Sequence, residues 1–147
     1  MTIKFDFREM SDEEYKRELS AFDEHGSEFN IPPEQSERFG YVATDETGKY
    51  IGSSSGLAQK YDEAYCDYFY LSDLLVEKEY RGKGYGRQLL ELLEQKIASL
   101  EIKYIWTWTA DYEASSFYLS RGYKTFVKFE KYYPTGHARV GLIKQLR

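Results

Sequence analysis

The sequence predicts an α+β fold built on a mixed sheet. Segments with strand character lie both before and after segments with helical character, and this order is typical of such folds. The strongest single pattern is helical: from Gly86 onward, apolar residues return at every third or fourth position, namely Leu89, Leu90, Leu93, Ile97 and Leu100. At 147 residues, 41% of them hydrophobic and 31% charged, the chain has the size and composition of a single folded domain spanning 1–147.

In the first half of the chain, alternation, capping residues and prolines locate the elements. Residues 3–8 alternate between apolar and polar side chains, which predicts a strand. Ser11 and Glu14 have the spacing of a capping box, and the helix that follows them is expected to end near Gly26. The elements expected in this half are a strand at 3–8, a helix at 11–26, a loop or short helix at 29–39, and hairpin strands at 39–44 and 50–58.

In the second half, glycines and apolar runs mark the boundaries. Gly122 follows a short helical pattern at the position that commonly ends a helix. The stretch from Pro134 to Gly136 predicts a turn between the last two strands. The elements expected here are a strand at 65–76, a helix at 86–100, a buried strand at 102–107, a short helix at 113–121, and strands at 123–132 and 138–146.

A glycine-rich stretch, Arg81 to Gly86, lies between an apolar strand and the long helix. This arrangement binds phosphate, because free N–H groups and the positive end of the helix dipole point at the anion. It is not a Walker loop, since no Ser or Thr follows before Ser99, and it is not a dinucleotide fingerprint, since Arg87 stands where a third glycine is required. Taken alone, the motif leaves open a turn that only joins strand to helix.

A second motif follows about thirty residues later. The form Arg-x-x-Gly-x-Gly at 81–86 resembles the acyl-CoA pyrophosphate loop of the GNAT superfamily, the CoA-dependent N-acetyltransferases. The segment 114–123 resembles the Ala-x-x-Phe-Tyr-x-x-x-Gly-Phe/Tyr segment of the same family. Two motifs in this order and at this separation are more specific than either alone. The resemblance covers residues 38–131, and the chain ends share only the order of elements.

The resemblance implies a GNAT-type sheet of six to seven mostly antiparallel strands flanked by about four helices, in the order β-α-(α)-β-β-β-α-β-α-β-β. It also implies an enzyme that uses acetyl-CoA as co-substrate and needs no metal. Main-chain groups of Leu74, Leu75 and Val76 would bind the pantetheine arm, and the N–H of Leu74 or Leu75 would polarise the acetyl carbonyl. The pyrophosphate would be bound by the loop residues Arg81, Gly82, Lys83, Gly84, Tyr85, Gly86 and Arg87.

Four polar residues are candidates for proton transfer or for contact with the co-substrate. Tyr118 stands where the family often places the acid that protonates the departing CoA thiolate. The amine must lose a proton before it attacks. Asp73, on the strand with the polarising amide, is the first candidate base, and Glu28 is a weaker one. Asp111 stands where the family often has an Asn that contacts the pantetheine arm; we favour an N-cap role for it, at the helix near residue 113.

Composition narrows the partners. The net charge of −5 and the lack of a basic face argue against nucleic acid. No long apolar run or signal core is evident, which argues against a membrane. The single cysteine, Cys66, excludes an internal disulfide framework. We therefore expect a cytoplasmic, metal-free protein. His137, in the turn before the last strand, is interpreted as structural, and the last strands could form the edge of a homodimer.

The expected acceptor is a primary amine of a small molecule, such as an antibiotic, a polyamine or an amino-acid-like amine. Acetylation of a protein or peptide amine is an alternative enzymatic function. A non-catalytic domain that binds or senses acyl-CoA is an alternative of a different class. A nucleotide-binding module is a third reading of the glycine-rich stretch.

Overall fold

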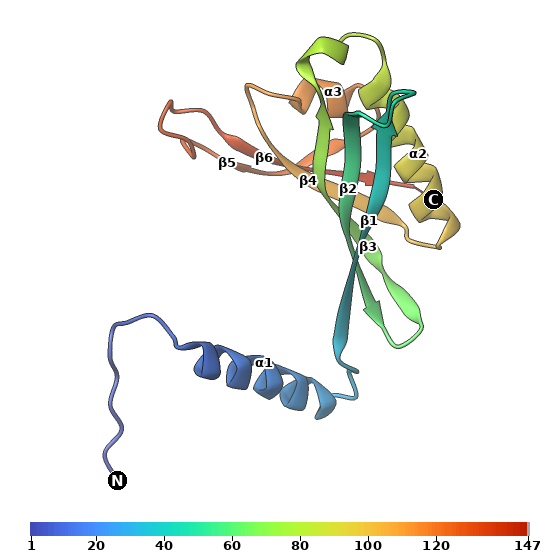
Figure 1. The fold of residues 1–147 in the computed structure, drawn as a ribbon. Coiled ribbons are helices and arrows are strands. Elements are labelled where there is room, and N and C mark those ends of the chain that lie inside the picture. The colour runs from blue at the N-terminus through green and yellow to red at the C-terminus, as the bar shows by residue number, and fades with distance from the viewer. Residues whose placement is uncertain (147) are drawn as a thin grey trace. The chain divides into compact units, whose positions relative to one another are not determined.

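The computed structural model describes residues 1–146, and the chain divides into two compact units, Met1–Glu34 and the part from Gln35 onward. The first unit contains helix α1 (Asp12–Ser27). The second contains the sheet, helices α2 (Tyr85–Ser99) and α3 (Ser115–Leu119), and the short 3-10 helix η1 (Lys78–Tyr80), all of which can be followed in Figure 1.

Helix α1 begins at the predicted capping box. The Ser11 hydroxyl accepts the Glu14 N–H at 3.1 Å, and a carboxylate oxygen of Glu14 accepts the Ser11 N–H at 3.0 Å. Arg8 donates two hydrogen bonds to the same carboxylate, at 2.9 and 3.0 Å. This guanidinium, and after it the Ser11 groups, lowers the pKa of Glu14 to about 2. The helix ends as predicted near Gly26, whose carbonyl accepts the Ile31 N–H at 3.0 Å.

The prediction of a strand at residues 3–8 is wrong. No residue of this segment belongs to a strand, and its apolar side chains, those of Ile3, Phe5 and Phe7, are exposed. Alternation favours an extended strand only when a neighbouring strand completes its hydrogen bonds. The unit formed by Met1–Glu34 has α1 as its only complete element, so it supplies no such neighbour.

The second unit is built on a six-stranded sheet with the order β1-β2-β3-β4-β6-β5. Its strands are β1 (Glu34–Thr44), β2 (Tyr50–Tyr61), β3 (Ala64–Val76), β4 (Tyr104–Ala110), β5 (Lys124–Phe129) and β6 (Arg139–Gln145). β3 and β4 pair in parallel, whereas the pairs β2–β3, β4–β6 and β5–β6 are antiparallel. The predicted α+β class is confirmed, with six strands and, within residues 1–146, three α-helices where about four were expected.

Several boundaries differ from those predicted: β2 and β4 end three residues later and β5 three residues earlier, and β1 and α3 differ as well. β1 begins at Glu34, inside the segment 29–39 for which two prolines predict a loop or short helix; the prolines lie just before the strand rather than within it. Helix α3 covers only Ser115–Leu119 of the predicted range 113–121. Its end is nevertheless marked as predicted by Gly122, which has a φ of +91°.

Helix α2 packs on one face of the sheet with the predicted apolar side. Leu89, Leu90, Leu93 and Ile97 are all buried. The last three join a cluster with strand residues that include Phe69, Leu71, Ile105 and Leu142. Burying a side chain of this size contributes about 1.5–3 kcal/mol. This packing holds α2, and with it the glycine-rich turn, against β2 and β3.

β3 and β4 separate after a short paired stretch. Their pairing runs only from Tyr68 opposite Tyr104 to Tyr70 opposite Trp106 within the described chain. One residue further on, the Thr107 hydroxyl donates to the carbonyl of Leu71 in β3 at 2.8 Å. Figure 1 shows β4 diverging from β3 beyond this point. We call the region between the separated strand ends, residues 74–76 and 108–111, the fork.

A β-bulge at Ser72 lies at the start of the fork. Ser55 of β2 faces Asp73, whereas the next residue of β2 faces Leu71, so Ser72 is the extra residue. An extra residue moves every following side chain to the other face of the strand. Leu71 before the bulge and Leu74 after it therefore both pack toward the core under α2, and Asp73 points to the opposite face.

Candidate active site

The glycine-rich turn presents main-chain N–H groups at the start of α2. Gly84 is the N-cap residue of this helix, with a φ of +85°, and no side chain caps the helix there. Gly82 also has a positive φ, of +76°. The first N–H groups of a helix have no partner inside the helix, and a Cβ added to either glycine would meet nothing within 4 Å. The turn thus has the geometry of an anion-binding site.

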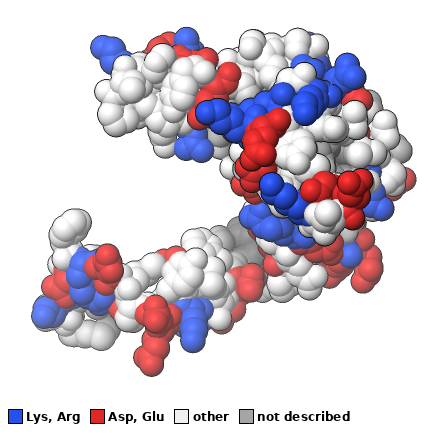
Figure 2. Space-filling view, turned by 45° about the horizontal axis from the view of Figure 1, so that its top comes forward, with Lys and Arg blue, Asp and Glu red and all other residues white. Residues whose placement is uncertain are grey.

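A cavity of about 410 Å³ lies beside this turn and reaches α3. It is lined by Val76, Tyr80, Arg81, Gly82, Gly84, Tyr85, Gly86, Arg87, Phe117 and Arg121. Figure 2, in which the upper end of Figure 1 comes forward, shows Lys and Arg side chains gathered on this end of the sheet unit beside Asp and Glu. Arginine side chains in the lining are well suited to bind phosphate oxygens.

The predicted cations of the turn also make contacts within the protein. Arg81 Nε donates to the Val76 carbonyl at 2.9 Å, which ties the turn to the end of β3. The Lys83 ammonium lies 5.5 Å from the centre of the Tyr80 ring. Arg87 lies 3.9 Å from a carboxylate oxygen of Glu91. The last two contacts are exposed and each contributes at most about 1 kcal/mol, so a bound phosphate could replace them.

Arg121 is a candidate site residue that the sequence reasoning missed. Its guanidinium carbon lies 3.9 Å from the centre of the Phe117 ring, and Nη1 donates to the Phe117 carbonyl at 3.0 Å. Its Nε is buried and has no hydrogen-bond partner among residues 1–146. An unpaired buried N–H costs about 1–3 kcal/mol, and an anion in the adjacent cavity would remove that cost. The sequence offers only one signal, a basic residue inside the second motif.

The main chain of β3 directs hydrogen-bonding groups into the fork. The N–H of Glu77 donates to the carbonyl of Ile51 in β2 at 2.8 Å. Alternate residues of an antiparallel strand direct their N–H and C=O groups toward and away from the partner strand. Leu75 therefore bonds to β2, whereas Leu74 and Val76 direct these groups into the fork. Of the two candidates for polarising an acetyl carbonyl, Leu74 has the N–H with the required direction.

Tyr118 lies where the fork begins. Its side chain is 5% exposed, and its hydroxyl is hydrogen-bonded to that of Thr107. Because the Thr107 hydroxyl donates its only proton to the Leu71 carbonyl, Tyr118 is the donor in this second bond. Burial raises the pKa of Tyr118 to about 12. The phenol therefore keeps its proton at neutral pH and can act as a hydrogen-bond donor.

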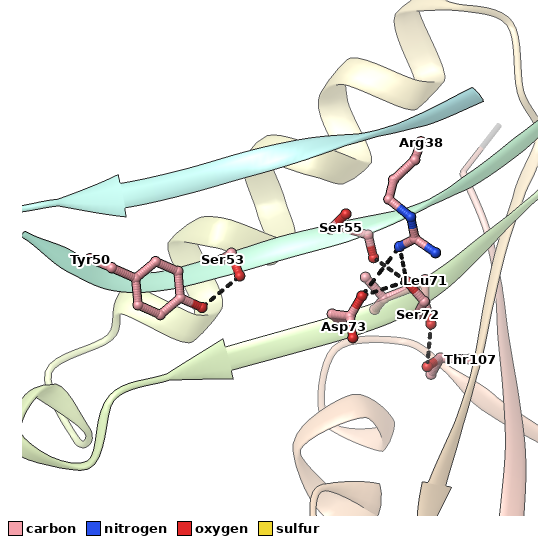
Figure 3. Close-up of polar contacts among 8 residues, drawn as sticks. All are labelled: Arg38, Tyr50, Ser53, Ser55, Leu71, Ser72, Asp73 and Thr107. Atoms are coloured by element: carbon pink, nitrogen blue, oxygen red, sulfur yellow. Dashed lines mark hydrogen bonds and ion pairs between the residues drawn. The ribbon is translucent and has the colours of Figure 1, made fainter.

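Asp73 belongs to a polar network on the face of the sheet opposite α2. The Ser72 hydroxyl lies 2.7 Å from Asp73 Oδ2, and Arg38 Nη1 lies 3.4 Å from the same oxygen. Arg38 also donates to the Ser72 hydroxyl at 2.8 Å. Figure 3 shows the guanidinium of Arg38 pointing toward Ser72 and Asp73. Oδ2 is thus engaged within the protein, which leaves Oδ1 to contact a cationic ligand at the edge of the fork.

Asp111 follows β4 on the side of the fork opposite β3, and its interpretation as a helix cap is wrong. The N-cap residue of α3 is Ala114, and no side chain caps that helix. Asp111 instead lies 2.8 Å from His137 through Oδ1 and Nδ1, and its Oδ2 accepts the Ala138 N–H at 3.1 Å. That N–H, and to a lesser extent His137, holds the pKa of Asp111 below its usual range. Contact of Asp111 with a pantetheine arm stays a prediction.

Glu28, the weaker candidate base, belongs to the first unit. It is the C-cap residue of α1, and its carboxylate lies 3.6 Å from Nδ1 of His25. Cys66 lies in β3, as expected of a sheet residue, with a free thiol. No group of three or more metal-binding side chains occurs among residues 1–146. The described helices include none with the length and apolar character needed to cross a membrane.

The family model for the acetyltransferase (GNAT) domain matches residues 36–125, more than half of the chain. This protein belongs to the GNAT acetyltransferase family. The matched range contains the glycine-rich turn, the fork and α3, so the resemblance predicted from the two motifs is confirmed. No curated protein sequence matches the chain significantly.

Solved structures show how far the GNAT fold extends along this chain. An acetyltransferase from Bacillus cereus ATCC 14579 is 21% identical, with a TM-score of 0.76 and coverage of 96% of this chain and 97% of that one. An aminoglycoside 6'-N-acetyltransferase complexed with coenzyme A is 19% identical, with a TM-score of 0.63 and coverage of 87% and 81%. The ribosomal-protein-S18-alanine N-acetyltransferase from Escherichia coli is 21% identical, with a TM-score of 0.59 and coverage of 76% and 69%. At these identities the likeness establishes the fold alone.

The residues of this GNAT chain fit an acyl-CoA molecule. The buried, unpaired Nε of Arg121 and the uncapped start of α2 both border one cavity, and both are suited to phosphate oxygens. The main-chain groups of Leu74 and Val76 continue from that cavity into the fork, where an extended amide-containing arm can pair with them as an added strand.

Proposed function

We propose that this GNAT protein transfers an acetyl group from acetyl-CoA to a primary amine of a small molecule, by direct attack in a ternary complex. The observation that carries the proposal is the continuity of three features. The uncapped, arginine-lined start of α2, the fork-facing amides of Leu74 and Val76, and the buried Tyr118 hydroxyl follow one another along the end of β3. A pyrophosphate, a pantetheine arm and a thioester follow one another in the same way along acetyl-CoA.

Binding of the donor would use the residues at the turn and the fork. The N–H groups of residues 81–87, together with Arg81, Lys83 and Arg87, would bind the pyrophosphate. Leu75 would bind no part of the arm directly, because its own N–H and C=O face β2. The Leu74 N–H would donate to the thioester oxygen and stabilise the negative charge that develops there.

The acceptor has to attack the thioester as a free amine. An alkyl amine has a pKa near ~10.4, so only about one molecule in ~2,500 is uncharged at pH 7. Asp73, on the face away from α2, would bind the ammonium through Oδ1 and hold it at the fork. Among the carboxylates, Asp73 stays the first candidate for accepting the proton. The nitrogen lone pair then forms the C–N bond, and the C–S bond breaks as the tetrahedral intermediate collapses.

The pKa of Tyr118 limits what this residue does for the leaving group. The free energy of moving a proton from a phenol with a pKa of about 12 to a thiolate with a pKa of about 8.5 is unfavourable by about 5 kcal/mol. Tyr118 therefore acts mainly as a hydrogen-bond donor, whose proton turns from the Thr107 oxygen to the thiolate as the C–S bond breaks. The proton that finally reaches sulfur comes from the attacking nitrogen or from water.

The proposal places the enzyme in the cytoplasm and names a small-molecule acceptor. Its test is a thiol-release assay with acetyl-CoA and a panel of amines that contains aminoglycosides, polyamines, amino acids and short peptides. Release that depends on a small amine supports the proposal. Release only with peptides would favour acetylation of a protein or peptide amine. Binding of CoA without release on any amine would identify a domain that senses acyl-CoA.

A further inference from the structure

Asp111 and His137 form a hydrogen-bonded pair beside the fork. Asp111 Oδ1 lies 2.8 Å from His137 Nδ1. Two bonds to Ala138 hold Asp111 in place: its N–H donates to the Ala138 carbonyl at 3.0 Å, and its Oδ2 accepts the Ala138 N–H at 3.1 Å. An ionised carboxylate only accepts hydrogen bonds, so Nδ1 carries the proton of the neutral ring. Nε2 is then the basic nitrogen, and it has no hydrogen-bond partner among the residues that the structure describes.

The pair lies on the β4 side of the fork, opposite the end of β3. The last paired position of β3 and β4 is Tyr70 opposite Trp106. Leu75 lies five residues beyond Tyr70, and Asp111 lies five residues beyond Trp106. The bulge residue Ser72 adds no register step, so the fifth step beyond Tyr70 on β3 is Val76. At about 3.3 Å per residue, Asp111 and Val76 both lie roughly 16 Å from the start of the fork, and Asp111 is therefore level with Val76, two residues beyond Leu74.

The imidazole is on the face of the sheet from which the acceptor is proposed to enter. Arg139, two residues after His137, places its guanidinium 5.1 Å from the centre of the Trp108 ring. Trp108 alternates along β4 with buried threonines that face the core, so its own ring lies on the face away from α2. Asp73 lies on this face too, on the other wall. A cationic amine bound by Asp73 would therefore have the histidine on the opposite side of the fork.

The surroundings of the imidazole allow it to exchange protons with water. The His137 side chain is 46% exposed. The Tyr112 ring lies 4.8 Å from the imidazole, and the Tyr133 N–H donates to the His137 carbonyl at 3.1 Å. The charged groups on the neighbouring strands are Lys128 of β5, which also lowers the pKa of Asp111, and Arg139 of β6. Asp111 is the negative group in contact with the ring.

We propose that His137, rather than Asp73, is the catalytic base that takes the proton from the acceptor ammonium, and that Asp111 is the positioning residue that keeps Nε2 free for it. The proposal rests on the proposed acetyl transfer. In this step the N–H bond of the ammonium breaks, its proton forms a bond to Nε2, and the freed lone pair attacks the thioester carbon. The imidazolium, paired with Asp111, then releases the proton to water.

The kinetic test compares His137→Gln with His25→Gln, since these are the two histidines of the chain. Glutamine can keep the hydrogen bond to Asp111 but cannot act as a base. We expect the kcat of His137→Gln to fall by 10²–10⁴-fold near pH 7, with an unchanged KM for acetyl-CoA. The deficit should shrink as the pH approaches 10, where the amine loses its proton in solution. His25→Gln should match the wild type.

The same pH dependence identifies the role of Asp111. Asp111→Asn should lower kcat by about tenfold or more, with a deficit that also shrinks at high pH, because the asparagine amide can donate to Nδ1 and favour the wrong tautomer. An unchanged kcat in His137→Gln would overturn the proposal. So would a deficit that is the same at every pH, since a purely structural role predicts that result.

A second measurement is independent of turnover. Nitrogen-15 NMR of the two imidazoles is recorded with CoA and with a conjugate in which the CoA sulfur is joined through an acetyl group to the nitrogen of propylamine. We expect the conjugate, and not CoA, to shift the His137 signals, with those of His25 unchanged. Unshifted His137 signals in the saturated complex would refute the placement of the base. If these signals shift but no amine is acetylated, the placement is supported and the proposed function fails.

Discussion

Gly84→Ala tests whether the start of α2 binds the co-substrate. Gly84 has a φ of +85°, and an added Cβ would meet nothing within 4 Å, so the substitution causes no clash in the free protein. It costs about 1–2 kcal/mol of backbone strain, and the Cβ fills space where a phosphate would approach the N–H groups. Hydrogen bonds to a charged group contribute about 1.5–3 kcal/mol each. Loss of one should therefore raise the Kd for CoA by about 10–100-fold.

Gly48→Ala is a matched control for this substitution. Gly48 has a φ of +87°, and its added Cβ would also meet nothing within 4 Å, but it lies in the turn between β1 and β2. Both variants should lose about 1–2 kcal/mol of unfolding free energy in urea. Only Gly84→Ala should weaken CoA binding in isothermal titration calorimetry. Equal Kd values for Gly84→Ala and the wild type, with the expected loss of stability, would refute the proposed role of the turn.

Three further predictions follow from the same site. Tyr118→Phe should lower kcat by about 10–100-fold without changing the KM for acetyl-CoA. Because the pKa of Tyr118 is raised to about 12, the phenol keeps its proton below that pH. Wild-type activity should therefore not fall through loss of this proton before about pH 11. Arg121→Met keeps the packing on Phe117 and should raise the Kd for CoA about tenfold in calorimetry; an unchanged Kd would assign Arg121 to packing alone. Asp73→Asn should raise the KM for a cationic amine in steady-state assays and leave the KM for acetyl-CoA unchanged, and the reverse pattern would remove Asp73 from the acceptor site.

Local patterns in the sequence predicted the parts of the fold that depend on neighbouring residues. The apolar face of α2 is set by residues three and four positions apart, and the glycine-rich turn by six consecutive residues. Both are confirmed in the structure. The capping box at Ser11 and Glu14 is confirmed for the same reason. The strand predicted at residues 3–8 is wrong because alternation says nothing about whether a partner strand is available.

Local patterns could not predict the parts of the candidate site that depend on contacts between residues far apart in the sequence. His137 looked like an isolated turn residue because its partner Asp111 lies 26 positions away, and the two meet only through the pairing of β4 with β6. Arg121 acquires its unpaired Nε from burial against Phe117 of α3. The direction of the Leu74 N–H depends on the bulge at Ser72, which the sequence does not mark.

That bulge makes the chemistry depend on a residue count as well as on residue identity. Before Ser72 the odd-numbered side chains of β3, such as Leu71, face α2, and after it the even-numbered ones, such as Leu74, do so. Removing any single residue between 71 and 74 would restore one uninterrupted alternation along β3. The segment beyond the deletion would then either expose its apolar side chains or turn its amides away from the fork. A substitution in this segment can keep the direction of the side chains and amides of β3, whereas a deletion of one residue changes it. The number of residues between Leu71 and Leu74 is therefore a feature to compare in related chains.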